Sequence, residues 1–313
     1  MKQFKFTFLA AVAGFAFAGA VPAQASCDDL CAAPVETAAT APASEIAGPA
    51  LWKVADEDTT IYLFGTIHVL PEGVTWMTPA IDAALGSSDV LVTEILMTPE
   101  ATVRSQQLVA ELGTLPAGTT LRSLMTEEQK TNYEAALVAL GLPAATFDPY
   151  EPWFATLTLS ILPLVKQGYR IDQGVEKVLE TKAESNLARD ALETIEFQLA
   201  IFDSAPMEAQ LQYLAQAIDG VDEVAPMVEA MVAEWLEGDA DGLAALMNED
   251  LDKAPEVAEA LLYNRNANWA QWIEERLATP GSVFMAVGAG HLAGARSVQD
   301  QLGQRGIAVS RVQ

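Results

Sequence analysis

Short apolar runs lie near both ends of the chain. Residues 59–64, 89–95 and 282–287 are rich in β-branched and aromatic side chains, which is typical of strands buried within a sheet. A further run at 307–312 predicts a closing strand. These positions predict that the two ends of the chain together build one sheet layer.

The long middle of the chain has helical patterns instead. Thr126 to Gln129 form a capping box, and the helix that follows is predicted to end near Gly141. Other helical segments are predicted after Thr78, at 151–165, at 174–184, at 293–303 and, several times, between 207 and 277. Only residues 187–192 interrupt them with a short run that is compatible with another strand. The sequence therefore predicts an α/β (α+β) fold, in which a central sheet of N- and C-terminal segments carries a large helical insertion.

The N-terminus predicts export. A basic start is followed by an apolar run over residues 6–21 and by Ala23-Gln24-Ala25, so we expect a signal peptide at 1–25 that is cleaved after Ala25. The alternative is an uncleaved anchor, which the short run and the small-residue cleavage site disfavour. We expect a periplasmic or secreted protein without stable membrane insertion. Residues 26–50, rich in Ala, Pro, Thr, Ser and Glu, predict a flexible tether, and residues 51–313 one domain.

Charge and cysteines limit the choice of partners. The formal charge is −26, and it becomes −28 once the signal peptide with Lys2 and Lys5 is removed. Such an acidic chain repels nucleic acid and anionic lipid, so neither is an expected partner. Cys27 and Cys31 are the only cysteines, and a disulfide between them would close a very small loop that stabilises the fold little. Lipidation of Cys27 is disfavoured, because Gln24-Ala25-Ser26 lacks the usual apolar residue.

The chain has only two histidines, and both follow the pattern Gly-x-x-His at the end of an apolar strand. The motifs are Gly65 to His68 and Gly288 to His291. With 20 glycines in 313 residues, chance would place both histidines at this offset roughly once in 250 cases. Glycine permits a tight turn and close backbone approach, so each imidazole is expected at the rim of the sheet. Imidazole there suits metal binding or proton transfer, and the alternative is two histidines that only cap turns.

Two imidazoles do not complete a metal site, so carboxylates are expected as further ligands. Glu94 follows an apolar strand and is the best candidate for a ligand at the same rim, unless it is an exposed strand-end carboxylate. Glu193 is a weaker candidate because its surroundings are crowded with acidic residues. Arg265 and Asn266 stand out in a chain with few basic residues, and Arg265 is suited to orient a carboxylate or bind an anionic group. The alternative for this pair is an ordinary helix surface.

Several segments together resemble the TraB/GumN family, and the resemblance covers essentially residues 51–312. The family includes the Tiki metalloproteases and is related in fold to ChaN-like and erythromycin-esterase-like proteins. The match is to its bacterial GumN-like branch. The matching segments are residues 51–54, residues 61–71, Leu192-Glu193-Thr194, Arg265-Asn266 and residues 287–292.

The resemblance implies a metal-dependent hydrolase. Its divalent ion, Mn, Co or Zn, would be held by His68, His291 and Glu94, and Glu94 would either ligate the ion or take the proton of a water molecule. Arg265 would contact the substrate or the developing oxyanion, and the surrounding shell would be formed by Glu193, Asn266, Gly65 and Gly288. Tiki proteins remove residues from the amino end of peptides and TraB-like relatives limit a peptide pheromone, so the expected substrate is a peptide or a small molecule.

Two alternatives to this function remain. In a metal-free hydrolase of the erythromycin-esterase type, one of the histidines would activate water with Glu94 as its orienting partner. In a non-catalytic protein, the same residues would sequester a peptide, haem or a metal ion. Sensitivity to a chelator separates the metal-dependent from the metal-free hydrolase, and any turnover excludes the non-catalytic protein.

Overall fold

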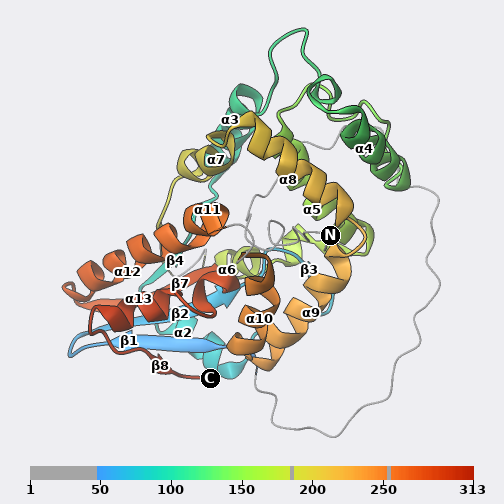
Figure 1. Ribbon diagram of the computed structural model, residues 1–313. Coiled ribbons are helices and arrows are strands. Elements are labelled where there is room, and N and C mark those ends of the chain that lie inside the picture. The colour runs from blue at the N-terminus through green and yellow to red at the C-terminus, as the bar shows by residue number, and fades with distance from the viewer. Residues whose placement is uncertain (1–47, 184–186, 252–254) are drawn as a thin grey trace, which may run out of the picture.

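The computed structural model describes residues 48–183, 187–251 and 255–313 (Figure 1). The predicted signal peptide at 1–25, nearly all of the predicted tether, and Cys27 with Cys31 lie outside the described residues. The predicted domain starting at residue 51 begins with the first strand of the sheet.

A six-stranded mixed sheet forms the centre of the fold, in the order β6-β4-β7-β2-β1-β8. Strands β6, β4, β7 and β2 run parallel to one another, whereas β1 is antiparallel to both of its neighbours. The strands are β1 (Leu51–Ala55), β2 (Thr59–Thr66), β4 (Val90–Thr93), β6 (Ala188–Ala191), β7 (Gly281–Gly288) and β8 (Ser310–Arg311). The prediction that both chain ends build one sheet is confirmed.

Three details differ from the sequence-based expectation. Strand β1 lacks a continuous apolar run, since Lys53 interrupts it, and the apolar pattern alone did not predict it. The closing strand is only two residues long, and both of its residues are exposed. The insertion is mainly helical, but β6 from within it joins the sheet edge, and β5 (Tyr169–Arg170) pairs with β3 (Leu70–Pro71).

Helices cover both faces of the sheet. The α-helices of the described residues, some on the sheet and some in a separate lobe, are α2 (Pro79–Gly86), α3 (Pro99–Leu112), α4 (Glu127–Ala139), α5 (Pro152–Lys166), α6 (Val175–Ala183), α7 (Ile195–Asp203), α8 (Met207–Asp219), α9 (Val224–Glu237), α10 (Ala240–Leu251), α11 (Pro255–Ala258), α12 (Asn264–Leu277) and α13 (Val298–Gln304). Short turns of other helical types are η1 (Leu121–Leu124), η2 (Ile171–Gln173), η3 (Glu259–Tyr263) and η4 (Ala289–Leu292). The predicted capping box of Thr126 and Gln129 is present at the start of α4. Helix α13 begins later than predicted, because Arg296 has a positive φ of 60° and Ser297 caps the helix.

Side chains of successive strand residues point to opposite faces of the sheet. In β2, Ile61 and Leu63 pack with α12 and α13, while Phe64 packs with the layer of α2, α6, α9 and α10. A separate apolar cluster joins α3, α4, α5, α7 and α8, which lie above the sheet in the view of Figure 1. Burying each large side chain contributes roughly 1.5–3 kcal/mol. The sheet is therefore fixed from both sides, and the helical lobe stands over one end of it.

Within the described ranges, no helix combines the length and apolar character that crossing a membrane requires.

Candidate active site at the rim of the parallel strands

Each of the four parallel strands delivers one chemically active side chain at its carboxyl end. In spatial order these are Glu193 after β6, Glu94 after β4, His291 after β7 and His68 after β2. The ends of β4 and β6 are tied together beyond the strands, because the Glu193 amide donates to the Glu94 carbonyl at 2.8 Å. Parallel strands end at one rim, and open α/β sheets use this rim for ligands.

The two Gly-x-x-His motifs lie side by side. In the register of β2 and β7, Gly65 pairs with Val287 and Thr66 pairs with Gly288. A Cβ on Gly65 would lie only 3.0 Å from the Ala289 Cα, so glycine here permits close approach of the second motif. Neither motif glycine has a positive φ, so the turn that we expected glycine to permit does not require it.

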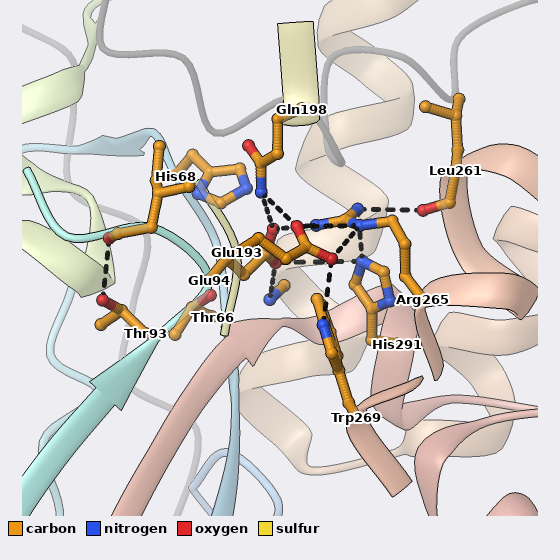
Figure 2. Close-up of polar contacts among 12 residues, drawn as sticks. Thr66, His68, Thr93, Glu94, Glu193, Gln198, Leu261, Arg265, Trp269 and His291 are labelled. Atoms are coloured by element: carbon orange, nitrogen blue, oxygen red, sulfur yellow. Dashed lines mark hydrogen bonds and ion pairs between the residues drawn. The ribbon is translucent and has the colours of Figure 1, made fainter. Parts of the chain in front are cut away.

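Glu94 and the two histidines converge on Gly288. A Cβ built on this glycine would lie 3.2 Å from Glu94 Oε1, 3.6 Å from His291 Cδ2 and 3.9 Å from His68 Nε2. The two imidazoles therefore approach to within 8 Å, although most of the chain separates them in sequence. Figure 2 shows His68 and His291 on opposite sides of Glu94.

Arg265 from α12 holds the centre of the site, and all five of its N–H donors are used. Nη2 donates to Glu94 Oε2 at 2.5 Å and to Glu193 Oε2 at 2.8 Å, and Nε donates to Glu193 Oε1 at 2.9 Å. Nη1 donates to the Leu261 carbonyl at 2.9 Å and contacts His291 Nε2 at 3.1 Å. The Arg265 side chain is only 3% exposed. The helix-surface alternative for Arg265 is wrong, and so is the exposed strand-end alternative for Glu94, which is 7% exposed.

The remaining lone pairs of the two glutamates are also used. Glu94 Oε1 accepts from the Gly288 amide at 2.8 Å, and the Gln198 amide on α7 bridges both carboxylates at 3.1 and 2.9 Å. The Trp269 indole donates to Glu193 Oε1 at 3.0 Å (Figure 2). Burial is the largest influence and raises the pKa of Glu94, but the Arg265 guanidinium, the two histidines and the Gly288 amide together outweigh it and lower this pKa to about 2. Glu94 is therefore a carboxylate throughout the physiological pH range.

His291 is neutral and fully paired. Asn266 Oδ1 can only accept, so the contact at 2.6 Å places the proton of His291 on Nδ1. The guanidinium of Arg265 can only donate, so Nε2 of His291 accepts the hydrogen bond from Arg265. The Asn266 amide nitrogen donates to the Arg296 carbonyl at 2.9 Å, which fixes the orientation of this amide. Burial and the neighbouring Arg265 hold the pKa of His291 well below its usual range.

His68 has the opposite surroundings. Its Nδ1 lies 2.6 Å from Glu176 Oε1 on α6, and the same oxygen accepts from the Thr66 hydroxyl. Its Nε2 is buried and has no hydrogen-bond partner in the part of the chain that the structure describes. Burial lowers the pKa of His68, but the Glu176 carboxylate and, more weakly, Glu94 outweigh burial and raise it to about 9.

The chemical nature of these ligand atoms suits a divalent ion, but their present arrangement suits it less well. Glu94 Oε1 and His291 Nε2 lie 3.9 Å apart, close to the roughly 3–4 Å between two ligands of one ion. His291 Nε2 is occupied by Arg265, however, and no group of three His, Cys, Asp or Glu in the described ranges is arranged to hold an ion. Ion binding would require His291 to exchange its contact with Arg265 for the ion.

The local charge is compatible with a cation. With both imidazoles neutral, the carboxylates of Glu94, Glu193 and Glu176 outnumber the single guanidinium of Arg265 by two charges. A divalent ion would neutralise this excess, and a proton on His68 neutralises half of it. The Nε2 atom of His68, which has no hydrogen-bond partner among the described residues, is best placed to bind either the ion or the proton.

Four residues of this site were not identified from the sequence. Glu176 and Gln198 lie on helices of the insertion, and Trp269 stands one turn after Arg265. Thr66 lies inside the first motif, where its place next to Gly65 was the only available indication. Nothing in the local sequence separates Glu176 from Glu180, the other acidic residue of α6.

Comparison with protein families matches residues 50–311 to the TraB/PrgY/gumN family. Neither the curated proteins nor the solved structures show a match to the chain. The family match spans the whole sheet, from β1 to β8, and every residue of the site. On this match, the chain belongs to the TraB/PrgY/gumN family.

Proposed function

We propose that the rim is the active site of a metal-dependent hydrolase that cleaves peptides in the periplasm or outside the cell. One observation carries the proposal: a buried imidazole nitrogen of His68, without a hydrogen-bond partner among the described residues, faces the Glu94 carboxylate and His291 around Gly288. An orphaned buried donor or acceptor is costly, so its retention favours a ligand role. The peptide as substrate class rests on the resemblance to the Tiki metalloproteases.

The ion would be held by His68 Nε2, Glu94 Oε1 and His291 Nε2. When bound, a divalent ion supplies a Lewis acid that polarises a carbonyl and lowers the pKa of a water molecule. Glu176 fixes the His68 ring so that Nε2 faces the site, and Asn266 does the same for His291. Gly288 leaves the space that a side chain would otherwise fill.

The acidity of Glu94 decides between two roles for this residue. A carboxyl group with a pKa of about 2 is a weak proton acceptor at neutral pH. We therefore assign Glu94 to binding and orientation rather than to general-base catalysis. Since every donor of Arg265 is engaged within the protein, Arg265 acts as a positioning residue for Glu94, Glu193 and His291 until a substrate displaces one of these contacts.

The contact between Arg265 and His291 favours a second candidate, a metal-free hydrolase. In this arrangement His291 stays paired, and His68 keeps its proton because its pKa is about 9. A protonated His68 that donates through Nδ1 to Glu176 would present Nε2–H as a general acid to a leaving group. The two candidates differ in the protonation of His68 and in their need for an ion.

Elemental analysis and turnover together test the proposal. The purified protein would be dialysed against chelator and supplied with Mn, Co or Zn, and cleavage of a mixed peptide panel would be followed by mass spectrometry. We expect activity that requires an ion and falls at least 100-fold in His68→Ala and His291→Ala. Glu196→Gln, which changes an exposed carboxylate on α7 beyond the cluster, should keep full activity.

Each other outcome is informative. Turnover that persists in chelator without bound metal overturns the metal-dependent mechanism and supports the metal-free candidate. Binding of metal or peptide without cleavage overturns hydrolysis and supports a sequestering protein. Full metal content and turnover in both histidine variants would remove the rim from the chemistry altogether.

A further inference from the structure

A cavity of about 280 Å³ lies beside the active-site rim, between α5, α7, α8 and the π-helical turn η3. Its walls are largely apolar, and its outer edge is exposed at Ser204, Pro206 and Ala260. Figure 1 shows these helices close together where the helical lobe meets α11 and α12. None of the chemistry described above uses this cavity.

The cavity and the active site share a wall. Leu261 lines the cavity, and its carbonyl accepts the Nη1 donor of Arg265, the residue that pairs with Glu94. Ile201 also lines the cavity and stands three residues after Gln198, so both lie on one side of α7. Gln198 in turn donates to Glu94. A group in the cavity would therefore be linked to the Glu94 carboxylate through Leu261 and Arg265.

The shared wall has an unusual backbone. Residues Glu259–Tyr263 form a π-helical turn that continues directly into α12 and contains both Ala260 and Leu261. Such turns are rare, and they occur frequently at functional sites because they reposition side chains and carbonyl groups. Here the turn places Ala260 and Leu261 in the wall of the cavity and directs the Leu261 carbonyl to Arg265.

Size and charge define what the cavity can take. Its volume is at the lower end of ligand pockets, roughly 300–1,000 Å³, so it fits one large side chain rather than a whole ligand. Glu256 is the only charged residue among those that line it, which disfavours an anionic group. Trp153, also in the wall, has a buried indole N–H without a hydrogen-bond partner in the described ranges, and a ligand oxygen that reached it would satisfy it.

We infer that this cavity is a specificity subsite, which receives a large apolar side chain, of leucine or phenylalanine type, from a neutral or cationic peptide. The inference rests on the proposed hydrolase function for its link to catalysis, while binding to the cavity is testable without turnover.

Two alanines on α8 provide a matched pair of variants. Ala209 lines this cavity, whereas Ala215, equally half-buried, lines a different hollow between α4 and α8. The probe is N-acetyl-4-fluorophenylalaninamide, followed by fluorine NMR. We expect wild type to bind it, Ala209→Trp to bind it at least tenfold more weakly, and Ala215→Trp to bind it within twofold of wild type. If Ala209→Trp fails to fold, Ala260→Leu fills the same cavity from its exposed edge.

Peptide turnover separates this inference from the proposed function. If the protein is a hydrolase, wild type should prefer leucine or phenylalanine peptides over alanine and aspartate peptides, and Ala209→Trp should lose this preference. Binding of the probe without cleavage of any peptide would overturn the hydrolase and keep the subsite. Cleavage with an unchanged preference in Ala209→Trp, or probe binding that this variant does not weaken, would overturn the subsite.

Discussion

The two Gly-x-x-His segments share one sequence pattern and stand on neighbouring strands, yet their imidazoles have opposite surroundings. His291 is 1% exposed, and both of its ring nitrogens are hydrogen bonded to α12. His68 is 14% exposed, and it has a carboxylate on one nitrogen and no partner among the described residues on the other. The motif therefore specifies where the backbone places a histidine, while the inserted helices specify its charge.

This difference gives the two histidines different roles. His291 is held neutral by burial and by the Arg265 guanidinium, so its charge does not change around neutral pH. His68 keeps a free position that a proton or a metal ion can occupy. Experiments that disturb one surrounding and not the other can break or sharpen this contrast.

The largest expected effect comes from removing the cation that Glu94 and Glu193 share. Arg265→Met leaves two buried carboxylates without their counter-charge, so we expect the free energy of unfolding to fall by about 3–5 kcal/mol. Urea denaturation measures this. Arg104→Met is the control, because Arg104 is 41% exposed and its solvent-screened ion pairs should contribute far less to stability. Equal losses in the two variants would mean that Arg265 is not the structural centre of the site.

The next effect concerns pH in the metal-free protein. The chain has only two histidines, so NMR should resolve both imidazoles, one titrating near pH 9 and the other staying neutral at and above neutral pH, because its pKa lies well below the usual value. Because the pKa of His68 lies above its unfolded value of 6.5, its stabilisation is complete below pH 6.5 and is lost as the pH rises through 9. The loss should be roughly 2–4 kcal/mol.

His68→Asn should remove most of this dependence on pH. Saturation with a divalent ion should release the His68 proton and shift the NMR titration of His68 to lower pH. Two histidines with the same midpoint would contradict the contrast between the motifs.

A smaller effect is expected from the glycine that allows the motifs to meet. A Cβ on Gly65 lies 3.0 Å from backbone of Ala289, so Gly65→Ala should destabilise the fold by about 1–3 kcal/mol and lower activity. Gly303 has open space around it within α13, and Gly303→Ala should stabilise the fold by up to about 1 kcal/mol. Thermal unfolding of both variants checks the pair. A neutral Gly65→Ala would show that the close approach is dispensable.

The smallest effect is expected at Thr66. Thr66→Val removes a buried hydroxyl that donates to Glu176, with an expected cost of about 1 kcal/mol and a looser His68 ring. Thr131→Val on α4, whose hydroxyl is exposed and bonds within its own helix, should change stability by less than half a kcal/mol. If Thr66→Val lowers activity no more than Thr131→Val does, the hydroxyl does not contribute to positioning His68.

The sheet and its rim were predictable because they are built from local patterns. Continuous apolar runs marked β2, β4 and β7, and parallel strands bring their carboxyl ends together. The positions of His68, Glu94 and His291 followed from these strands. The partners that set their charge states were not predictable, since Glu176 and Gln198 come from helices whose placement depends on long-range packing.

Arg265 shows the limit of such predictions most clearly. Its rarity in an acidic chain drew attention to it, but sequence could not separate a surface arginine from a buried one with five engaged donors. The difference arises from the packing of α12 against the sheet through Trp269 and Ile273, which places Arg265 over the strand ends. Tertiary context of this kind has no local sequence pattern.

The pairing of β2 with β7 also has a consequence for how the protein acquires its activity. The two strands lie far apart in the sequence, and His291, which follows β7, is the last residue of the site to be synthesised. Contacts between such distant segments form slowly, because a long loop must close before they stabilise anything. An emerging chain thus carries only part of the site, and the site is complete only when β7 pairs with β2. The order of synthesis alone delays completion of the site until this later strand has emerged.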